Sequence, residues 1–429
     1  MSLKNYLNIA KNELFKLNRS ITGRDSLKTL KIIKRELPQL KISKFNSGKK
    51  VFDWKIPPEW TVNNAFIEDK FGNKIVNFEN NNLHLVGYSN PVNLKIKKKK
   101  LLERLHSLEK QKNAIPYVTS YYKNYWGFCV SEKHKNKIKK KYLDSDKFKI
   151  LIDSKFDTKG SLNYGELVLK GKTKQEILIT TYICHPSMAN NELSGPIVSM
   201  ALIKHFSNKK LNKSLRFIFI PETIGSIAYI HRNLKKLKKN VIGGYNLTCI
   251  GDERNYSCMF SKFQNSPSDK SLIEAFNKLK IKYKEYSFLE RGSDERQFSS
   301  PGVDLPITSI FRSKYREYPE YHTSLDNFNL VTLRGLKGGY EVAKLSINNL
   351  MHKIIPKPRI ICEPMLIKKK LYKSVSIKNN DKLSSRKILD FLMYADGKND
   401  LEKISDIIKI NYNLTFKIYN LLKKNKLVN

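Results

Sequence analysis

Apolar residues recur every three to four positions through residues 3–37, and this spacing predicts two helices separated by a break at residues 20–23. The pattern then changes to short β-prone runs, and Asp69–Gly72 supplies a hairpin turn between the last two of them. These runs cover residues 51–54, 65–67 and 74–78. A small β module is therefore expected. The aromatic run at residues 117–128 either packs the core of this module or its junction with the next domain, or forms a platform on which sugars or bases stack.

Between residues 175 and 350, continuous apolar runs alternate with segments of helical periodicity. Strands are expected at 176–183, 215–221, 241–250 and 307–311, and helices at 193–206, 226–234, 271–279 and 332–350. Apolar strands that alternate with helices are typical of a mostly parallel sheet with helices on both faces. The sequence thus predicts an α/β domain, in which ligands bind beyond the carboxyl ends of the strands.

Three prolines between residues 356 and 364 mark a linker, and three short amphipathic helices follow it, at 384–393, 400–408 and 414–424. This outline is typical of a winged-helix unit, whose third helix could enter a DNA groove. The apolar residues of that helix are expected to pack against the rest of the domain. Docking to another domain, or dimerisation, is therefore favoured over DNA binding. The expected domains are opening helices (1–45), an inserted small β domain (46–130), the α/β domain (131–355) and a winged-helix-like domain (365–429).

The composition is that of a globular protein. The chain has 429 residues, of which 40% are hydrophobic, and is long enough for two to four domains, which excludes disorder throughout. No stretch approaches the roughly 18 consecutive apolar residues that a membrane span needs, and the start lacks an apolar signal region. Five widely spaced cysteines without a C-x-x-C pair indicate reduced thiols. We therefore expect a cytoplasmic protein with no membrane partner.

The charge is strongly basic: 81 Lys and Arg stand against 39 Asp and Glu, a formal net charge of +42. Such an excess can bind nucleic acid by neutralising phosphates. However, the basic residues are mostly lysines scattered through every segment beside abundant Asn and Ile, which an AT-rich genome produces through codon bias. A nucleic-acid partner is therefore not the favoured interpretation.

Polar residues of unusual kind gather in four segments at or near the ends of the expected strands, namely 184–195, 221–226, 291–297 and 317–326. A site that activates water on a divalent metal needs neutral imidazoles and carboxylates as ligands, an open coordination position and a carboxylate as general base. The suitable candidates are His185, Glu222, Asp252, Asp294, Glu295 and His322. Each alone also has an ordinary explanation; Glu222, for example, could favour the start of the following helix.

Five blocks of the sequence carry a resemblance: His185 with the downstream Asn-x-x-Ser-Gly, Glu222 with Gly225-Ser226, Asn246–Gly251, Ser293-Asp294, and His322-Thr-x-x-Asp. They look like the corresponding blocks of the clan of co-catalytic zinc aminopeptidases and glutaminyl cyclases. More closely, the whole chain resembles bacterial proteins with an aminopeptidase-like domain, an inserted small β domain and a C-terminal winged helix. Several members of that family are labelled as polysaccharide-biosynthesis proteins.

The resemblance implies roles for single residues. His185 and His322 fall at the two histidine-ligand positions of the clan, and Glu222 falls where its general base sits. The acidic ligand positions hold Asn191, Thr223 and Thr248. Asn and Thr bring no negative charge to hold two cations at close range. We therefore expect one zinc ion or none.

The expected metal ligands are His185 and His322 with a recruited carboxylate, Asp252, and the expected general base is Glu222. If Glu222 is itself a ligand, the base would have to be Glu192 or Glu295. Arginine forks suit carboxylates or phosphates, so an anionic substrate is expected. The expected substrate-binding residues are Asp294, Glu295, Arg296, Arg291 and Tyr321.

These residues predict a metal-dependent hydrolase of aminopeptidase type that cleaves an amide bond in a small-molecule, peptide or glycoconjugate substrate, and the family labels suggest surface polysaccharide biosynthesis. Two other functions stay open. A metal-free pocket on a degenerate hydrolase fold would bind a ligand without chemistry, and the three lost acidic positions favour that alternative. A nucleic-acid-binding regulator would act through the C-terminal helices.

Overall fold

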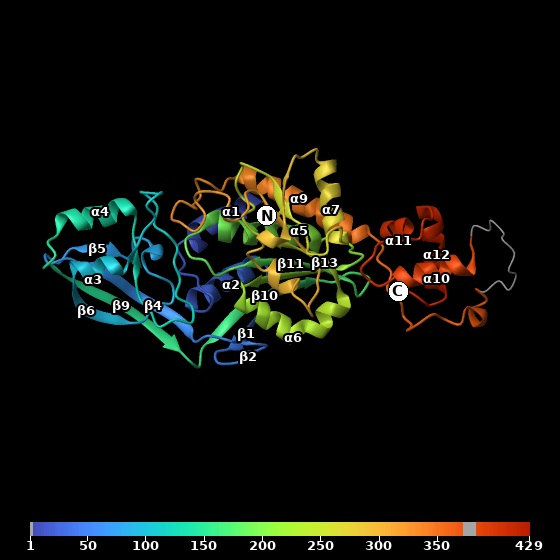
Figure 1. Cartoon of the computed structure of the whole chain (residues 1–429), viewed down its shortest axis with the longest axis horizontal. Helices are drawn as coiled ribbons and strands as arrows, with labels where there is room; N and C mark the ends of the chain where they lie inside the picture. The colour runs from blue at the N-terminus through green and yellow to red at the C-terminus, as the bar shows by residue number, and fades with distance from the viewer. Residues whose placement is uncertain (1–2, 372–382) are drawn as a thin grey trace.

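Three regions lie in a row in the computed structural model (Figure 1): a small β domain at one end, a large α/β domain in the middle and a helical domain at the other end. The structure describes residues 3–371 and 383–429. Residues 1–2 of the expected opening helices and 372–382 of the expected C-terminal domain lie outside the described residues. The α/β class predicted from the alternating pattern is confirmed.

An eight-stranded mixed sheet forms the centre, in the order β1-β10-β12-β11-β13-β16-β14-β15. Its strands are β1 (Lys41–Asn46), β10 (Ser161–Leu169), β11 (Glu176–Tyr182), β12 (Ser214–Ile220), β13 (Val241–Leu247), β14 (Ser257–Met259), β15 (Lys284–Tyr286) and β16 (Ile307–Phe311). The four central strands, β12, β11, β13 and β16, run parallel and are buried throughout. Parallel strands covered on both faces need apolar side chains on both, which explains the continuous runs in the sequence.

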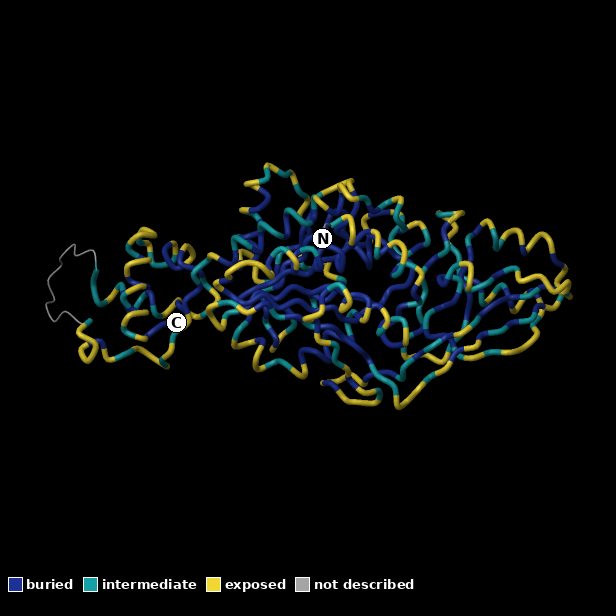
Figure 2. Tube along the Cα trace, turned by 180° about the vertical axis from the view of Figure 1, so that it is seen from behind, coloured by how far each residue is buried: buried dark blue, intermediate teal, exposed yellow. Residues whose placement is uncertain are grey.

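Helices cover both faces of the sheet. The helices α1 (Leu3–Ile9), α5 (Ser194–Ser207), α7 (Pro267–Lys278) and α9 (Leu333–His352) pack on one face, and α6 (Ile224–Asn240) lies on the other. The opening segment continues through a π-helical turn, η1 (Ala10–Leu14), and then α2 (Arg24–Glu36), with the predicted break between them. Two large apolar clusters result, one on each face, and the central sheet is the most deeply buried part of the chain (Figure 2).

The small β domain is inserted between β1 and β10, which are antiparallel neighbours in the large sheet. Its four antiparallel strands lie in the order β5 (Lys74–Asn77), β4 (Glu59–Glu68), β9 (Lys147–Asp157) and β6 (Val92–Lys97). Strand β9 lies beyond residue 130, where the sequence pattern placed the end of this domain. It belongs to the domain because it pairs with both β4 and β6 in the middle of the sheet.

Shorter elements complete the insertion: β2 (Lys50–Val51), β3 (Trp54–Lys55), η2 (Asn82–His84), α3 (Lys98–Glu103), β7 (Leu105–His106), β8 (Phe128–Cys129) and α4 (Glu132–Lys141). The loop between β7 and β8 carries most of the aromatic run noted in the sequence. This loop reaches the α/β domain, where Pro116 and Thr323 form an isolated antiparallel bridge. The insertion is therefore anchored at a loop of the large domain as well as at its two connecting strands.

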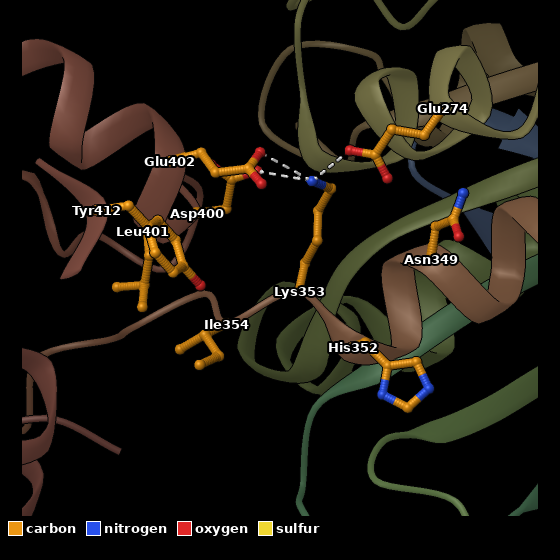
Figure 3. Close-up of a pocket in the computed structure, with 9 residues that line it drawn as sticks. All are labelled: Glu274, Asn349, His352, Lys353, Ile354, Asp400, Leu401, Glu402 and Tyr412. Atoms are coloured by element: carbon orange, nitrogen blue, oxygen red, sulfur yellow. Dashed lines mark hydrogen bonds and ion pairs between the residues drawn. The ribbon is translucent and has the colours of Figure 1, made fainter. Parts of the chain in front are cut away.

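The C-terminal domain contains the three predicted helices, α10 (Ser385–Tyr394), α11 (Leu401–Ile407) and α12 (Tyr412–Lys424), after a short turn, η5 (Leu366–Lys369). It has an apolar cluster of its own. Lys353 joins it to the α/β domain (Figure 3): its Nζ lies 2.7 Å from Glu274 Oε1 of α7 and 3.1 Å from Glu402 Oε2 of α11. Asp400 adds a third carboxylate at 3.6 Å.

Among the described residues, no helix combines the length and the hydropathy that crossing a membrane would require.

We expect Lys353→Met to lower the free energy of unfolding by about 1–2 kcal/mol, because it leaves the partly exposed Glu274 and Glu402 without this cation and the buried Asp400 with only Lys270, at 3.8 Å. Urea unfolding followed by circular dichroism measures the change. The control is Lys344→Met, which removes a partly exposed pair with Glu341 within α9 and should cost less than about 0.5 kcal/mol. Equal losses in the two variants would contradict the role of Lys353.

Candidate active site

The candidate site lies where the four parallel strands end. His185 follows β11, Glu222 follows β12 and Thr248 follows β13, while His322 lies in the loop after β16. Parallel strands end at one edge of the sheet, so segments that are far apart in the sequence meet there. The sequence prediction had placed its polar clusters at this edge for the same reason.

The two histidines lie beside each other and beside Glu222. Their ring centroids are 5.3 Å apart, and His185 Nε2 is 4.0 Å from Glu222 Oε2. Burial lowers the pKa of His185 to about 3 and that of His322 well below its ordinary value, so both imidazoles are neutral. The Nε2 atom of His322 is buried and has no hydrogen-bond partner among the described residues. A neutral imidazole with a free nitrogen is the form that binds a metal ion.

His185 is oriented by a buried ion pair. Its Nδ1 is 3.0 Å from Glu192 Oε2, and the other oxygen of Glu192 is 3.4 Å from Arg19 Nε. Arg19 Nε also donates to the backbone carbonyl of His185 at 3.0 Å. Burial raises the pKa of Glu192 to about 8, while the Arg19 guanidinium acts in the opposite direction and favours the carboxylate. When Glu192 is ionised, its Oε2 accepts the Nδ1 proton of His185. The lone pair of His185 is then on Nε2, which faces Glu222.

The inserted β domain supplies a wall of the site through Tyr117. The centroid of its ring is 5.2 Å from that of His185 and 5.1 Å from that of His322. The backbone N–H of Tyr117 donates to the carbonyl of His322 at 2.8 Å. His322 has a positive φ of 54°, and Tyr321 stacks on its ring at 3.9 Å. The imidazole is therefore held between two tyrosines, one of which comes from the insertion.

The carboxyl group of Asp294 is close enough to that of Glu222 to affect its pKa. Burial and the Asp294 charge raise the pKa of Glu222 to about 8, and burial raises the pKa of Asp294 to about 7. Asp294 Oδ1 accepts the backbone N–H of Thr223 at 2.9 Å, and Thr223 is held at a positive φ of 64°. The residue after Glu222 is thus fixed in an uncommon backbone conformation by the Asp294 carboxylate.

The side chains of Asn191, Thr223 and Thr248, at the three positions where the resemblance implies acidic ligands, are uncharged and take part in hydrogen bonds. Asn191 Nδ2 donates to Tyr182 Oη at 2.6 Å, and Thr248 Oγ1 donates to the Asn191 carbonyl at 3.1 Å. Thr223 Oγ1 accepts from Arg296 Nη2 at 2.6 Å. These groups bring no negative charge that could balance a pair of cations. The donor set does not fit two metal ions.

One ion fits the remaining donors better. His322 Nε2 has no hydrogen-bond partner among the described residues, and His185 Nε2 faces the carboxyl group of Glu222; the buried Asn191 Oδ1 and Asp294 Oδ2 likewise have no hydrogen-bond partner there. Among the described residues, one group of three ligand-type side chains has its atoms within 4.8 Å of one another: Cys184, His185 and Glu192. In that group burial raises the thiol pKa well above its ordinary value, and Glu192 already faces Arg19. We interpret it as a hydrogen-bonded support for His185.

Two predicted site residues have structural partners instead. Asp252 accepts hydrogen bonds from Asn190 Nδ2, from the backbone N–H of Arg254, and from the backbone and hydroxyl of Ser313, at 2.8–3.1 Å. These hydrogen bonds join neighbouring loops and occupy both carboxylate oxygens of Asp252. Glu295 likewise accepts from the backbone N–H groups of residues 292 and 293 and from the side chains of Asn246, Ser309 and Tyr315. Neither carboxylate is free to serve as a ligand or base.

The other predicted substrate-binding residues are placed as follows. Tyr321 lies on His322, Asp294 is close enough to raise the pKa of Glu222, and Arg296 contacts Thr223, so these three belong to the site. Arg291 is exposed, and its guanidinium donates to the nearby Phe288 carbonyl at 3.3 Å.

Sequence reasoning missed Arg19 and Tyr117. Arg19 lies about 170 positions before its partners, and no pattern within the opening helices distinguishes it from the other basic residues.

The chain matches a family described as a domain of unknown function, DUF4910, over residues 8–353, and a winged helix-turn-helix over residues 354–429. The chain belongs to the DUF4910 family. A relative from Clostridium acetobutylicum is 39% identical over 398 residues, which cover 92% of this chain and 89% of the relative. Its name proposes a role in polysaccharide biosynthesis and describes an aminopeptidase-like domain. These matches confirm the resemblance found in the sequence.

Solved structures show that this DUF4910 chain has an aminopeptidase-like fold. A crystal structure from Clostridium acetobutylicum, whose name proposes a peptidase, has a TM-score of 0.79 and 34% identity, covering 100% of this chain and 96% of that one. The zinc aminopeptidase of Bacillus subtilis has a TM-score of 0.60 and 13% identity, covering 80% and 93%. At that identity the second likeness shows the fold alone.

We expect Arg19→Met and Glu192→Gln each to lower the free energy of unfolding by about 3 kcal/mol, because each leaves one buried polar partner unpaired. The double variant should lose at least about 1 kcal/mol less than the sum of the two, as urea unfolding would show.

The control cycle uses Arg35→Met and Glu13→Gln, an exposed pair with a 2.8 Å contact between neighbouring helical segments. Its coupling should be within about 0.5 kcal/mol. Additive losses in the buried pair would contradict the role assigned to it.

Proposed function

We propose that the protein is a peptidase-like hydrolase that cleaves an amide bond with the help of one zinc ion. The observation that carries this proposal is the convergence of two neutral imidazoles and the Glu222 carboxylate at the carboxyl edge of the sheet. The aminopeptidase-like fold supports the reaction class. The loss of all three acidic ligand positions limits the metal to a single ion.

His185 and His322 would hold the ion through Nε2. Zinc, when bound there, supplies Lewis acidity toward an amide carbonyl and makes water a stronger acid. Glu222 then takes a proton from the attacking water at its Oε2 and returns it to the leaving nitrogen. Glu192 keeps the Nδ1 proton of His185 in place, and Asp294 fixes the backbone next to Glu222. We leave Asp252 out of the metal site because the loops occupy its oxygens.

The substrate class follows from the rim of the site. Arg296, which contacts Thr223 beside Glu222, favours an anionic group, because guanidinium forks match carboxylates and phosphates. Tyr117 and Tyr321 provide ring surfaces on which a sugar or a peptide side chain can lie. The name of the Clostridium acetobutylicum relative supports a glycoconjugate substrate in polysaccharide biosynthesis.

Glu222→Gln separates the two roles that Glu222 could have. As a general base, its loss should leave zinc content unchanged and lower the rate of amide cleavage by about 100-fold or more. Zinc is measured by elemental analysis after equilibration with added zinc, and cleavage by a panel of N-acyl and aminoacyl anilides. His185→Gln/His322→Gln should lose both zinc and activity, and the surface variant Glu341→Gln should keep both.

Loss of zinc in Glu222→Gln would make Glu222 a ligand and contradict its role as base. A wild-type protein that stays free of zinc after zinc addition would overturn the hydrolase proposal.

That second outcome would favour a different function, a ligand-binding protein on a degenerate hydrolase fold. The specific observation in its favour is the uncharged network of Asn191, Tyr182 and Thr248, in which Asn191 Nδ2 and Thr248 Oγ1 are hydrogen-bonded without a metal, while Asn191 Oδ1 has no partner among the described residues.

A further inference from the structure

A second cavity of about 930 Å³ lies between the α/β domain and the C-terminal domain, and we name it the junction groove. One wall consists of residues 172–175, 212–213 and 239–240, which immediately precede β11, β12 and β13. Parallel strands begin at the edge opposite to the one where they end. The junction groove and the candidate active site are therefore on opposite edges of the sheet.

The facing wall includes helix α12. Phe416, Tyr419, Asn420 and Lys423 line the groove, and their spacing of three, four and seven positions places them on one face of the helix. The Phe416 side chain is 39% exposed although it is aromatic. The third helix of the winged-helix domain thus presents an aromatic and polar face to the α/β domain.

Eight basic side chains line the junction groove, and none of the described residues that line it is acidic. The chain as a whole has about one acidic residue for every two basic ones, 39 against 81. The lining of the groove is therefore richer in positive charge than the chain on average.

Two of the eight cations are committed elsewhere. Lys213 Nζ donates to the carbonyls of Leu350 and Met351 at the end of α9, and Lys353 pairs with the carboxylates shown in Figure 3. The other six form no ion pair within the described parts of the chain. They are Lys172, Lys174, Lys239, Lys357, Arg359 and Lys423.

The shape of the groove argues against duplex DNA as the ligand. In winged-helix proteins the third helix enters the major groove of the duplex, which is about 12 Å wide. Here the exposed face of α12 borders a cleft whose other wall is the α/β domain, so a duplex cannot surround this face. A cavity of this size matches the range of small-molecule sites, about 300–1,000 Å³.

We propose that the junction groove binds a small ligand with two or more phosphate groups and a planar ring, of the nucleoside diphosphate type. Lysines of both walls, such as Lys174 and Lys423, neutralise the phosphates. The ring stacks on Phe416, because aromatic faces bind bases of any kind. The amides of Asn212, Asn240 and Asn420 offer donors and acceptors to the rest of the ligand.

The test measures binding of ADP and of inorganic pyrophosphate to the full-length protein by calorimetry, at low salt and at about 200 mM salt. Lys174→Glu/Lys423→Glu reverses one charge on each wall and should weaken ADP binding about tenfold or more. The matched control, Lys99→Glu/Lys140→Glu, makes the same change in net charge on exposed lysines of the β domain and should leave the affinity within about twofold.

Phe416→Ala tests the ring separately. It should weaken ADP about fivefold and leave pyrophosphate unchanged. Absence of ADP binding to the wild type would overturn the proposal. Equal losses of ADP affinity in the two charge-reversed variants would also overturn it, because the general positive charge of the protein would then explain the binding. Equal effects of Phe416→Ala on both probes would overturn the assignment of the ring. Tighter binding of a 20-base-pair duplex than of ADP, lost in Lys174→Glu/Lys423→Glu, would assign the groove to nucleic acid instead.

Discussion

The parallel pairing of β12, β11, β13 and β16 is the constraint on which the rest of the structure depends. It gives the sheet two chemically different edges, one where the four strands end and one where they begin. The histidines and Glu222 collect at the first edge, and the lysine-rich segments that precede β11, β12 and β13 collect at the second. The insertion contacts the first edge and the winged helix the second, so each additional domain borders a different candidate site.

The insertion does more than extend the chain. It leaves the large sheet after β1 and returns in β10, and these two strands pair directly. Its aromatic loop crosses to the carboxyl edge and places Tyr117 against both histidines. This contact covers one side of the two imidazoles, and reduced access of water strengthens electrostatic interactions between the groups that it covers.

The site lies at the carboxyl edge of an aminopeptidase-like fold, and uncharged residues stand at the positions where the resemblance implies acidic ligands. What replaces them is a set of neutral hydrogen bonds around Asn191 and Thr248, together with a buried Arg19–Glu192 pair that orients His185. Burying such a pair is costly, and it leaves His185 with one defined orientation and one free nitrogen.

The sequence by itself predicted the α/β class and the alternation of strands with helices between residues 175 and 350, and it named His185, Glu222 and His322 as candidates, because hydrophobic periodicity and strand ends are local properties. The sequence could not determine which carboxylates have oxygens without hydrogen bonds to the rest of the protein. Asp252 and Glu295 have suitable chemistry, but only the folded structure shows that their oxygens are occupied by bonds to Ser313, Asn246 and other groups. Strand β9, Arg19 and the junction groove were likewise decided by the tertiary structure, since each depends on segments that are distant in the sequence and are brought together only by packing.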